Sequence, residues 1–193
     1  MNINVIVAMS HSNRGIGFKN NIPWHIPDDL KRFSKLTKGD GNNAIIMGRK
    51  TWESLPLRPL PKRQNIILSK QLLDNNYEIK LFDNELYFSN LNDAIENCKL
   101  KDINTVWIIG GEKIYDLALK TLSINRVYIT TIIKNYKCDT FFPKLSNNFK
   151  IISTEFSSIY CTLIKYEIYE NTYHPFIVNE KNNNEINKVK DVF

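Results

Sequence analysis

The sequence predicts an α/β fold with a central, mostly parallel sheet, helices on both of its faces, and an antiparallel pair of strands at the C-terminal end. Short apolar runs rich in β-branched residues alternate along the chain with segments of helical length, a pattern typical of parallel sheets covered on both faces. The last two apolar segments follow one another without an intervening helix and alternate apolar with polar residues, which predicts antiparallel pairing. A length of 193 residues fits one domain with a short appendage.

In the N-terminal half, residues 3–9 predict a buried strand that is followed by a long irregular stretch over 10–23. Irregular stretches of this length in compact domains are commonly functional. A helix is expected over 27–38, because a proline stands at its first position, two aspartates follow, and lysines stand near its far end. Strands are expected over 44–47, 65–68 and 86–88, with a short helix after the first of them and a proline-rich irregular segment over 55–63.

The C-terminal half continues the alternation of helix and strand. Asn90 suits a helix cap, so we expect a helix over 91–98. The remaining expected elements are a strand over 105–109, a helix that ends near residue 120, a strand over 126–132, and antiparallel strands over 151–157 and 161–169.

The composition excludes several classes of protein. The longest apolar stretches, 5–9 and 106–109, are far shorter than the ~20 residues that cross a bilayer, and the N-terminus lacks the basic region of a secretory signal. Three widely spaced cysteines argue against a disulfide framework and for a reducing, cytoplasmic location. Three scattered histidines argue against a metal centre.

The chain carries a net charge of +6 without a basic run or a nucleic-acid-binding motif. A small polyanionic ligand therefore explains the charge better than a specific nucleic acid does. Residues 174–193 are polar and rich in Asn and Lys, with balanced charges. We expect a folded domain over 1–173, followed by a tail or linker over 174–193.

Three predicted strands end in small residues followed by polar ones. These junctions are Ala8 with its loop, Gly48-Arg49-Lys50-Thr51, and Gly110-Gly111-Glu112-Lys113. Glycines at a helix N-terminus let backbone N–H groups approach a phosphate, although each junction taken alone is as consistent with a tight turn. Three at one sheet edge indicate a dinucleotide, yet neither the Rossmann fingerprint nor a P-loop is present.

Among the acidic residues, Asp29 is the strongest candidate for a functional carboxylate. It lies four residues before Phe33, so both share one face of the predicted helix. That position places a carboxylate at the edge of an apolar face, below the long loop. Compensation of the helix dipole is the alternative reading, and Asp28 fits that role better.

At this point the residues resemble a known family, the dihydrofolate reductases, over about residues 1–171. Seven motifs match in unbroken order: Ile22-Pro23-Trp24-x-x-Pro27-x-Asp29-Leu30-x-x-Phe33; Ile46-Met47-Gly48-Arg49-Lys50-Thr51-Trp52-Glu53-Ser54; Arg58-Pro59-Leu60-Pro61-Lys62-Arg63-x-Asn65; Leu68-Ser69-Lys70; Trp107-Ile108-Ile109-Gly110-Gly111-x-x-Ile114-Tyr115; Tyr128-Ile129-Thr130; and Asp139-Thr140-Phe141-Phe142-Pro143. The resemblance implies the family's fold and NADPH-dependent reduction of 7,8-dihydrofolate to tetrahydrofolate, which supports one-carbon metabolism and thymidylate synthesis. It also implies that antifolates bind.

The resemblance implies a substrate site with Asp29 on the pterin, Thr130 supporting it, and Trp24 ordering a water through which the proton reaches N5. Arg63 matches the arginine that binds the α-carboxylate of the glutamate. Ile22 belongs to the catalytic set, and the other implied substrate contacts are Ile6, Val7, Ala8, Leu30, Phe33, Ser54, Leu55, Leu60, Ile109 and Tyr115.

The resemblance likewise implies a cofactor site in which Arg49, Lys50 and Lys70 surround the 2′-phosphate and select NADPH over NADH. The other implied cofactor contacts are Ala8, Ile16, Gly17, Gly48, Thr51, Leu68, Ser69, Ile109, Gly110, Gly111, Glu112, Lys113, Ile114 and Tyr115. Gly110-Gly111 matches a pair that the family joins by a cis peptide, and the stretch 10–23 matches its mobile loop. Glu112 departs from the neutral residue common there, and we expect its side chain to point away from the phosphates.

Two other functions stay open at this stage. A riboflavin-pathway reductase shares the fold and NADPH, but it does not require Asp29, Trp24 and Arg63 in these motifs. A non-catalytic basic module that binds folate or nucleic acid is the second alternative, and the complete set of expected site residues argues against it. The tail also raises the possibility of fusion to, or association with, thymidylate synthase.

Overall fold

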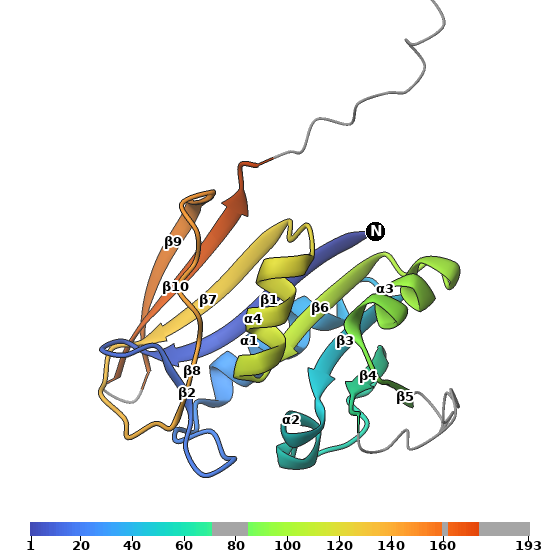
Figure 1. Ribbon diagram of the computed structural model, residues 1–193. Coiled ribbons are helices and arrows are strands. Elements are labelled where there is room, and N and C mark those ends of the chain that lie inside the picture. The colour runs from blue at the N-terminus through green and yellow to red at the C-terminus, as the bar shows by residue number, and fades with distance from the viewer. Residues whose placement is uncertain (71–84, 160–161, 174–193) are drawn as a thin grey trace, which may run out of the picture.

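The chain folds around an eight-stranded sheet whose strands run in the order β5-β4-β3-β6-β1-β7-β10-β9 (Figure 1). The computed structural model describes residues 1–70, 85–159 and 162–173. Six neighbouring strands are parallel: β5 (Glu85–Phe88), β4 (Gln64–Leu68), β3 (Asn43–Gly48), β6 (Thr105–Gly110), β1 (Asn2–Ser10) and β7 (Arg126–Ile132). The last two, β10 (Thr162–Asn171) and β9 (Phe149–Ile159), are antiparallel. The predicted fold class is confirmed.

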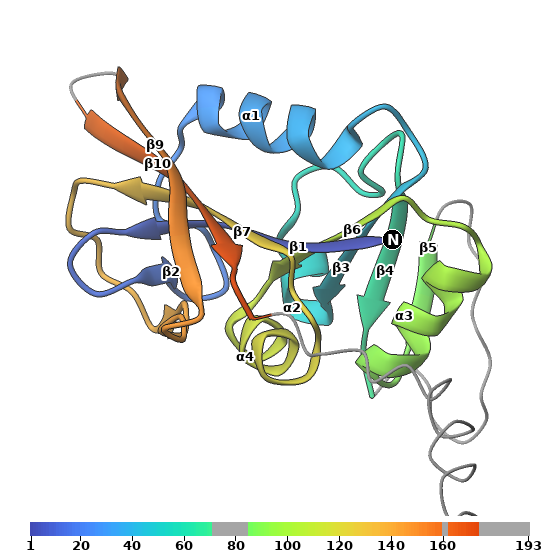
Figure 2. The same ribbon diagram turned by 90° about the horizontal axis from the view of Figure 1, so that it is seen from above.

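Helices cover both faces of this sheet, as Figure 2 shows. Helix α1 (Pro27–Lys38) lies on one face, and α3 (Leu91–Leu100) and α4 (Glu112–Thr121) lie on the other. The short α2 (Arg49–Ser54) follows β3 directly. Helix α1 begins at the predicted proline with acids in its first turn, and it ends before Gly39, whose φ is 50°.

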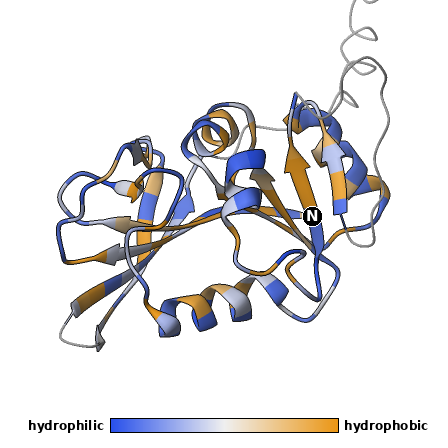
Figure 3. Cartoon of the chain, turned by 90° about the horizontal axis from the view of Figure 1, so that it is seen from below, coloured by the Kyte–Doolittle hydropathy of each residue, from blue (hydrophilic) through white to orange (hydrophobic). Residues whose placement is uncertain are grey.

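The two faces of the sheet bury separate apolar clusters because successive strand residues point to opposite sides. Under α3 and α4, the buried cluster includes Val5, Ile46, Val106 and Ile108. Under α1, the smaller cluster is built from Ile6, Ile45, Met47, Trp52, Ile67 and Trp107. Figure 3 shows the apolar strands enclosed between helices of mixed character. Continuous apolar runs in the sequence therefore correspond to strands buried on both sides.

The stretch 10–23 is not wholly irregular, which corrects the prediction. Within it, β2 (Gly15–Gly17) pairs antiparallel with β8 (Thr140–Phe141), and neither strand was expected. A Cβ at Gly15 would lie 2.3 Å from the sulfur of Cys138, so the partner segment packs directly on this backbone. Strands of two or three residues carry no periodicity, and this pair forms only through contact between distant segments.

Several bounds also differ by one or two residues from those expected, as is usual at element ends. Helix α3 continues to Leu100, and β9 is longer than the segment 151–157. In the described part of the chain, no helix has the length and apolar character needed to cross a membrane. Cys98 and Cys138 are free thiols, whereas Cys161 and the predicted tail 174–193 fall outside the described residues.

Removing residues 174–193 is expected to leave the domain folded. Strand β10 ends at Asn171, and the chain after it is held by hydrogen bonds from Thr172 to Asn148 and from the Tyr173 amide to Asn171. All of the buried hydrophobic residues found in the described chain precede Glu167. A chain that ends at residue 173 should keep the thermal midpoint of the full chain in differential scanning calorimetry. A fall of several degrees would contradict the proposed domain boundary.

Candidate functional site

The three glycine- or alanine-containing junctions lie together at one edge of the sheet. Strands β3, β6 and β1 are neighbours and run parallel, so their carboxyl ends emerge side by side. Ligands of open α/β sheets bind in crevices at such ends. Helix α4 starts immediately after Gly111, and no side chain caps its first turn. Uncapped N–H groups at a helix start can bind an anion.

Gly110 is required by the backbone geometry of this junction. Its φ is 114°, a conformation that L-residues with side chains rarely adopt. A Cβ at this position would lie 2.9 Å from the ring of Tyr115. The Gly110–Gly111 peptide bond is cis, as the resemblance implies. The turn therefore presents bare backbone at the sheet edge.

Tyr115 is buried beneath that turn and joins it to the central strand. Its hydroxyl donates a 2.8 Å hydrogen bond to the backbone carbonyl of Ile6, and its ring meets Phe142 edge-on at 5.1 Å. Burial raises the pKa of the Tyr115 phenol far above its ordinary value, so the hydroxyl stays protonated. The contact fixes the start of α4 relative to β1.

Asp29 faces Thr130 across the gap between α1 and β7. The Thr130 hydroxyl donates a 2.7 Å hydrogen bond to Asp29 Oδ1, which joins residues 101 positions apart in the sequence. Burial raises the pKa of the Asp29 carboxyl, while this hydrogen bond and the charge of Arg32 act in the opposite direction and do not cancel the rise. A carboxyl whose pKa is raised by burial is a candidate functional group.

Arg63 is 7% exposed, and none of the ion pairs found between described residues includes it. Its guanidinium donates to the Thr37 hydroxyl through one nitrogen and to the Pro61 carbonyl through Nε at 3.0 Å. Its charged end lies 5.9 Å from the ring centre of Phe33. Burial lowers the pKa of this group. A buried cation of this kind normally binds an anion.

Apolar side chains gather under α1, the helix that carries Asp29. The cluster under α1 brings together the sequence-predicted residues Ile6, Phe33, Leu55, Leu60 and Ile109. Val7 is buried on the opposite face of the sheet, where it cannot share that wall. Ile22 and Leu30 are 59% and 50% exposed.

The predicted tryptophan and serine lie apart from this wall. Trp24 packs against the ring of Tyr136 at 5.2 Å, next to a small buried cluster that includes Ile26 and Ile132. The exposed Ser54 donates to the Thr51 carbonyl within its own helix. The structure therefore joins Asp29 to Thr130 directly, and it places Trp24 and Ser54 in separate local contacts.

The basic residues at the predicted cofactor site differ in whether they form ion pairs with described acids. Lys50, Lys70 and Lys113 are exposed, and no ion pair to a described acid involves them. Arg49, in contrast, forms a 2.6 Å ion pair with Glu53 one helical turn away. Exposed ion pairs are weak, so this contact does not prevent Arg49 from binding a ligand.

The remaining predicted contacts lie at the end of β4, in β2 and in α4. Leu68 and Ser69 are buried at the end of β4, Gly17 is buried, and Ile16 and Ile114 are half-buried against the larger core cluster. The Glu112 carboxylate accepts a 3.2 Å hydrogen bond from the Phe141 amide. This contact directs the acid toward β8.

Two residues that position parts of the site, Thr37 and Asp139, were not among the site residues predicted from the sequence. Thr37 donates to the Phe33 carbonyl at 2.8 Å and accepts from Arg63, so it positions the buried cation. Asp139 accepts a 2.9 Å hydrogen bond from the Lys19 amide and donates its own amide to the Gly17 carbonyl. In the sequence, only its place in the last of the seven family motifs pointed to Asp139, and nothing there indicated that it holds the loop.

Comparison with known proteins finds one consistent relationship. A family model described as dihydrofolate reductase matches residues 2–171. A dihydrofolate reductase from Aedes albopictus is 36% identical over 157 residues, which cover 78% of this chain and 84% of that protein. One from Buchnera aphidicola is 46% identical, over 74% of this chain and 78% of the relative. A bifunctional dihydrofolate reductase-thymidylate synthase from Daucus carota is 35% identical, over 74% of this chain and 28% of that protein.

Replacing Thr130 with Val is expected to raise the pKa of Asp29 further. The hydroxyl stabilises the ionised carboxylate, and valine removes that hydrogen bond while keeping the volume of the side chain. The carboxyl carbon of Asp29, followed by NMR against pH, should therefore titrate at higher pH in the variant than in the wild type. Thr154→Val on the exposed edge strand is the control and should leave the titration unchanged. An unaltered or lowered pKa in Thr130→Val would contradict the assigned contact.

Proposed function

The chain belongs to the dihydrofolate reductase family, and from that premise we propose that it reduces 7,8-dihydrofolate to tetrahydrofolate at the edge where β1, β6 and β3 end. The observation that carries the proposal is the carboxylate of Asp29, held by the Thr130 hydroxyl at 2.7 Å beside an apolar wall. A pterin offers that carboxylate an amino group and a ring N–H as donors. Both oxygens can then accept, which compensates the loss of water.

Different residues of the site bind different parts of the substrate. Asp29 and Thr130 hold the pterin, and the apolar cluster with Ile6, Phe33 and Leu60 takes the rings and excludes water, which strengthens electrostatic interactions in the site. Arg63, buried and free of ion pairs to described acids, binds the α-carboxylate of the glutamate. The acid and the cation thus recognise opposite ends of one elongated molecule.

The family uses a nicotinamide cofactor, and the residues at the strand ends fit one. The bare backbone at Gly110 and the uncapped start of α4 accept a pyrophosphate. When bound, the cofactor supplies the hydride. Lys50 and Lys70 are exposed cations near the ends of β3 and β4, and with Arg49 they favour NADPH through its 2′-phosphate.

The chain's own residues also deliver the proton and close the site. Trp24, packed on Tyr136 at 5.2 Å, orders the water through which N5 of the pterin is protonated, and Ile22 at the end of the loop covers the nicotinamide. Asp139 accepts a hydrogen bond from the Lys19 amide and donates one to the Gly17 carbonyl, and these two contacts hold that loop in place. Loops of this kind gate access to the reacting centre.

The partners and location follow from the same proposal. The bifunctional relative contains a thymidylate synthase part, and the tail after residue 173 is the place where this chain would join or contact such a protein. Dihydrofolate and antifolates are the small-molecule partners. The free thiols of Cys98 and Cys138 suit a reducing compartment, so a cytoplasmic location stays our prediction.

Replacing Asp29 with Asn tests the substrate site. Loss of absorbance at 340 nm with NADPH should depend on dihydrofolate in the wild type and fall about 10- to 10⁴-fold in the variant, because one or two charge-assisted hydrogen bonds of ~1.5–3 kcal/mol each are lost. Glu155→Gln on the edge strand is the matched control and should retain full activity. Near-normal turnover of the variant at neutral pH would contradict the proposed role.

The same variant should fold, and it should be more stable than the wild type at neutral pH. Because burial raises the pKa of Asp29 above 3.8, the ionised form is disfavoured in the folded state. The wild type therefore loses stability as pH rises above about 3.8 toward the raised pKa. The stability difference between variant and wild type, from urea unfolding, should shrink as the pH is lowered through that window.

Replacing Lys50 and Lys70 together with Ala is expected to reduce the preference for NADPH over NADH. Two contacts to the 2′-phosphate at about 1 kcal/mol each correspond to a loss of roughly 10- to 30-fold in the ratio of kcat/KM values. The kcat/KM value for NADPH should fall while that for NADH stays the same, since NADH lacks the 2′-phosphate. Lys150→Ala on β9 serves as control. An unchanged ratio would show that the phosphate binds elsewhere, even if dihydrofolate reduction itself is intact.

A further inference from the structure

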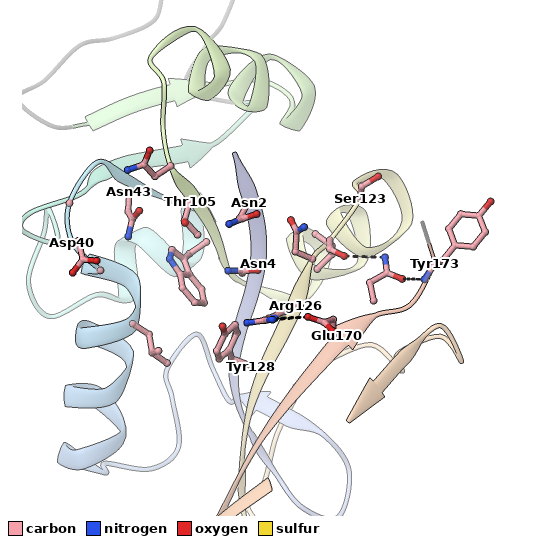
Figure 4. Close-up of a pocket in the computed structure, with 18 residues that line it drawn as sticks. Asn2, Asn4, Asp40, Asn43, Thr105, Ser123, Arg126, Tyr128, Glu170 and Tyr173 are labelled. Atoms are coloured by element: carbon pink, nitrogen blue, oxygen red, sulfur yellow. Dashed lines mark hydrogen bonds and ion pairs between the residues drawn. The ribbon is translucent and has the colours of Figure 1, made fainter. Parts of the chain in front are cut away.

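A cavity of about 680 Å³ opens at the opposite end of the same strands (Figure 4). Its lining includes residues from the starts of β1, β6 and β7, together with the turn that follows α1. The proposed reduction site lies where β1, β6 and β3 end, so the length of these strands separates it from the cavity, although both lie on the face of the sheet that α1 covers. The volume lies within the range of small-molecule sites.

A row of side chains crosses the sheet at the floor of this cavity. Asn4 on β1 is the register partner of Trp107 on β6 and of Arg126 on β7, and Arg126 in turn is the partner of Glu170 on β10. Partners in register on neighbouring strands present their side chains on the same face. All four residues line the cavity. The row therefore forms one polar surface across four strands.

Two members of this row carry buried polar atoms without a partner. Asn4 is 7% exposed and Trp107 is 4% exposed. The Oδ1 atom of Asn4 and the Nε1 atom of Trp107 find no hydrogen-bond partner among the described residues. Native proteins satisfy nearly all such atoms, and an exception asks for an explanation. One acceptor and one donor, side by side on adjacent strands, suit a ligand with neighbouring donor and acceptor groups.

The charges around the cavity disfavour an anionic ligand. Arg126 is the one cationic side chain among the lining residues, and it donates twice to Glu170, at 2.9 and 2.7 Å. Asp40 adds a negative charge to the lining and takes part in none of the ion pairs found in the described chain. With two acids and one cation in its lining, the cavity disfavours a phosphate or carboxylate.

Other features of the lining favour a ring that carries hydroxyl groups. Trp107 and Tyr128 pack at 5.0 Å and offer an apolar aromatic surface beside the polar row. The amides of Asn43 and Asn125 are fixed by hydrogen bonds to the Thr37 carbonyl and the Ile3 amide, so they form stable walls. We propose that this cavity binds a small, uncharged, hydroxyl-rich ring, the chemistry shared by monosaccharides and the ribose of nucleosides.

The indole N–H resonance of Trp107 reports on this site directly. It is assigned with Trp107→Phe, and Trp24 and Trp52 serve as internal references. With the full chain saturated with NADPH, glucose or adenosine at millimolar concentration should shift the Trp107 signal saturably. A response to glucose alone identifies a free sugar, and one to adenosine alone a nucleoside. Adenosine 5′-monophosphate should bind at least about tenfold more weakly than adenosine. No shift with either probe, or equal binding of the monophosphate, would overturn the proposal.

Asn4→Val separates binding from folding. Valine removes the unpartnered oxygen from a strand, so the thermal midpoint should stay the same or rise while the affinity for the probe falls at least about tenfold. Asn97→Leu is the matched control, because Asn97 also has a buried unpartnered Oδ1 but does not line the cavity. Dihydrofolate reduction should be unchanged in both. If Asn4→Val does not fold, Thr105→Val takes its place. Unchanged affinity in the cavity variant, or an equal loss in Asn97→Leu, would overturn the proposal.

Discussion

The pairing of the central strand β1 with two strands from the second half of the chain is the constraint on which the rest of the molecule depends. Its register with β6 runs from Asn2 to Val5, and its register with β7 runs from Asn4 to Ser10. This arrangement brings Ile6 within reach of the Tyr115 hydroxyl on α4. It also places Thr130, the register partner of Ala8, opposite Asp29 on α1. A shift by one residue would move each of these side chains to the other face.

Desolvation gives the proposed active site its chemistry. Asp29 and Arg63 are expected to hold the substrate, and burial withdraws both from water. It raises the pKa of Asp29 and lowers that of Arg63, so that the neutral form of each group is favoured. Such groups reduce the stability of the empty domain but bind a complementary ligand strongly, because little water has to be displaced. The hydroxyls of Thr130 and Thr37 hold Asp29 and Arg63 in place without neutralising their charge.

The two ends of the sheet differ in charge and therefore in the ligands that they suit. At the carboxyl ends, exposed lysines accompany an uncapped helix start, a combination for anions, whereas the buried Arg63 directly precedes β4. In the cavity at the amino ends of β1, β6 and β7, the one arginine among the described lining residues is paired with Glu170, and amide and aromatic side chains dominate. The net charge of +6 says nothing of this difference, since it is a sum over the whole surface.

The linear pattern of residues was enough to predict the fold class, the order of helices and strands, and the motifs at the strand ends, because each of these depends on local periodicity and local turn chemistry. Asp29 and Arg63 were identified in the same way, from motifs of a few residues. Contacts between distant segments needed the three-dimensional structure. The hydrogen bond from Thr130 to Asp29, the pairing of β2 with β8, and the role of Thr37 beneath Arg63 all join separate elements. The unpartnered atoms of Asn4 and Trp107 likewise depend on register and layer packing, and no stretch of neighbouring residues encodes these relations.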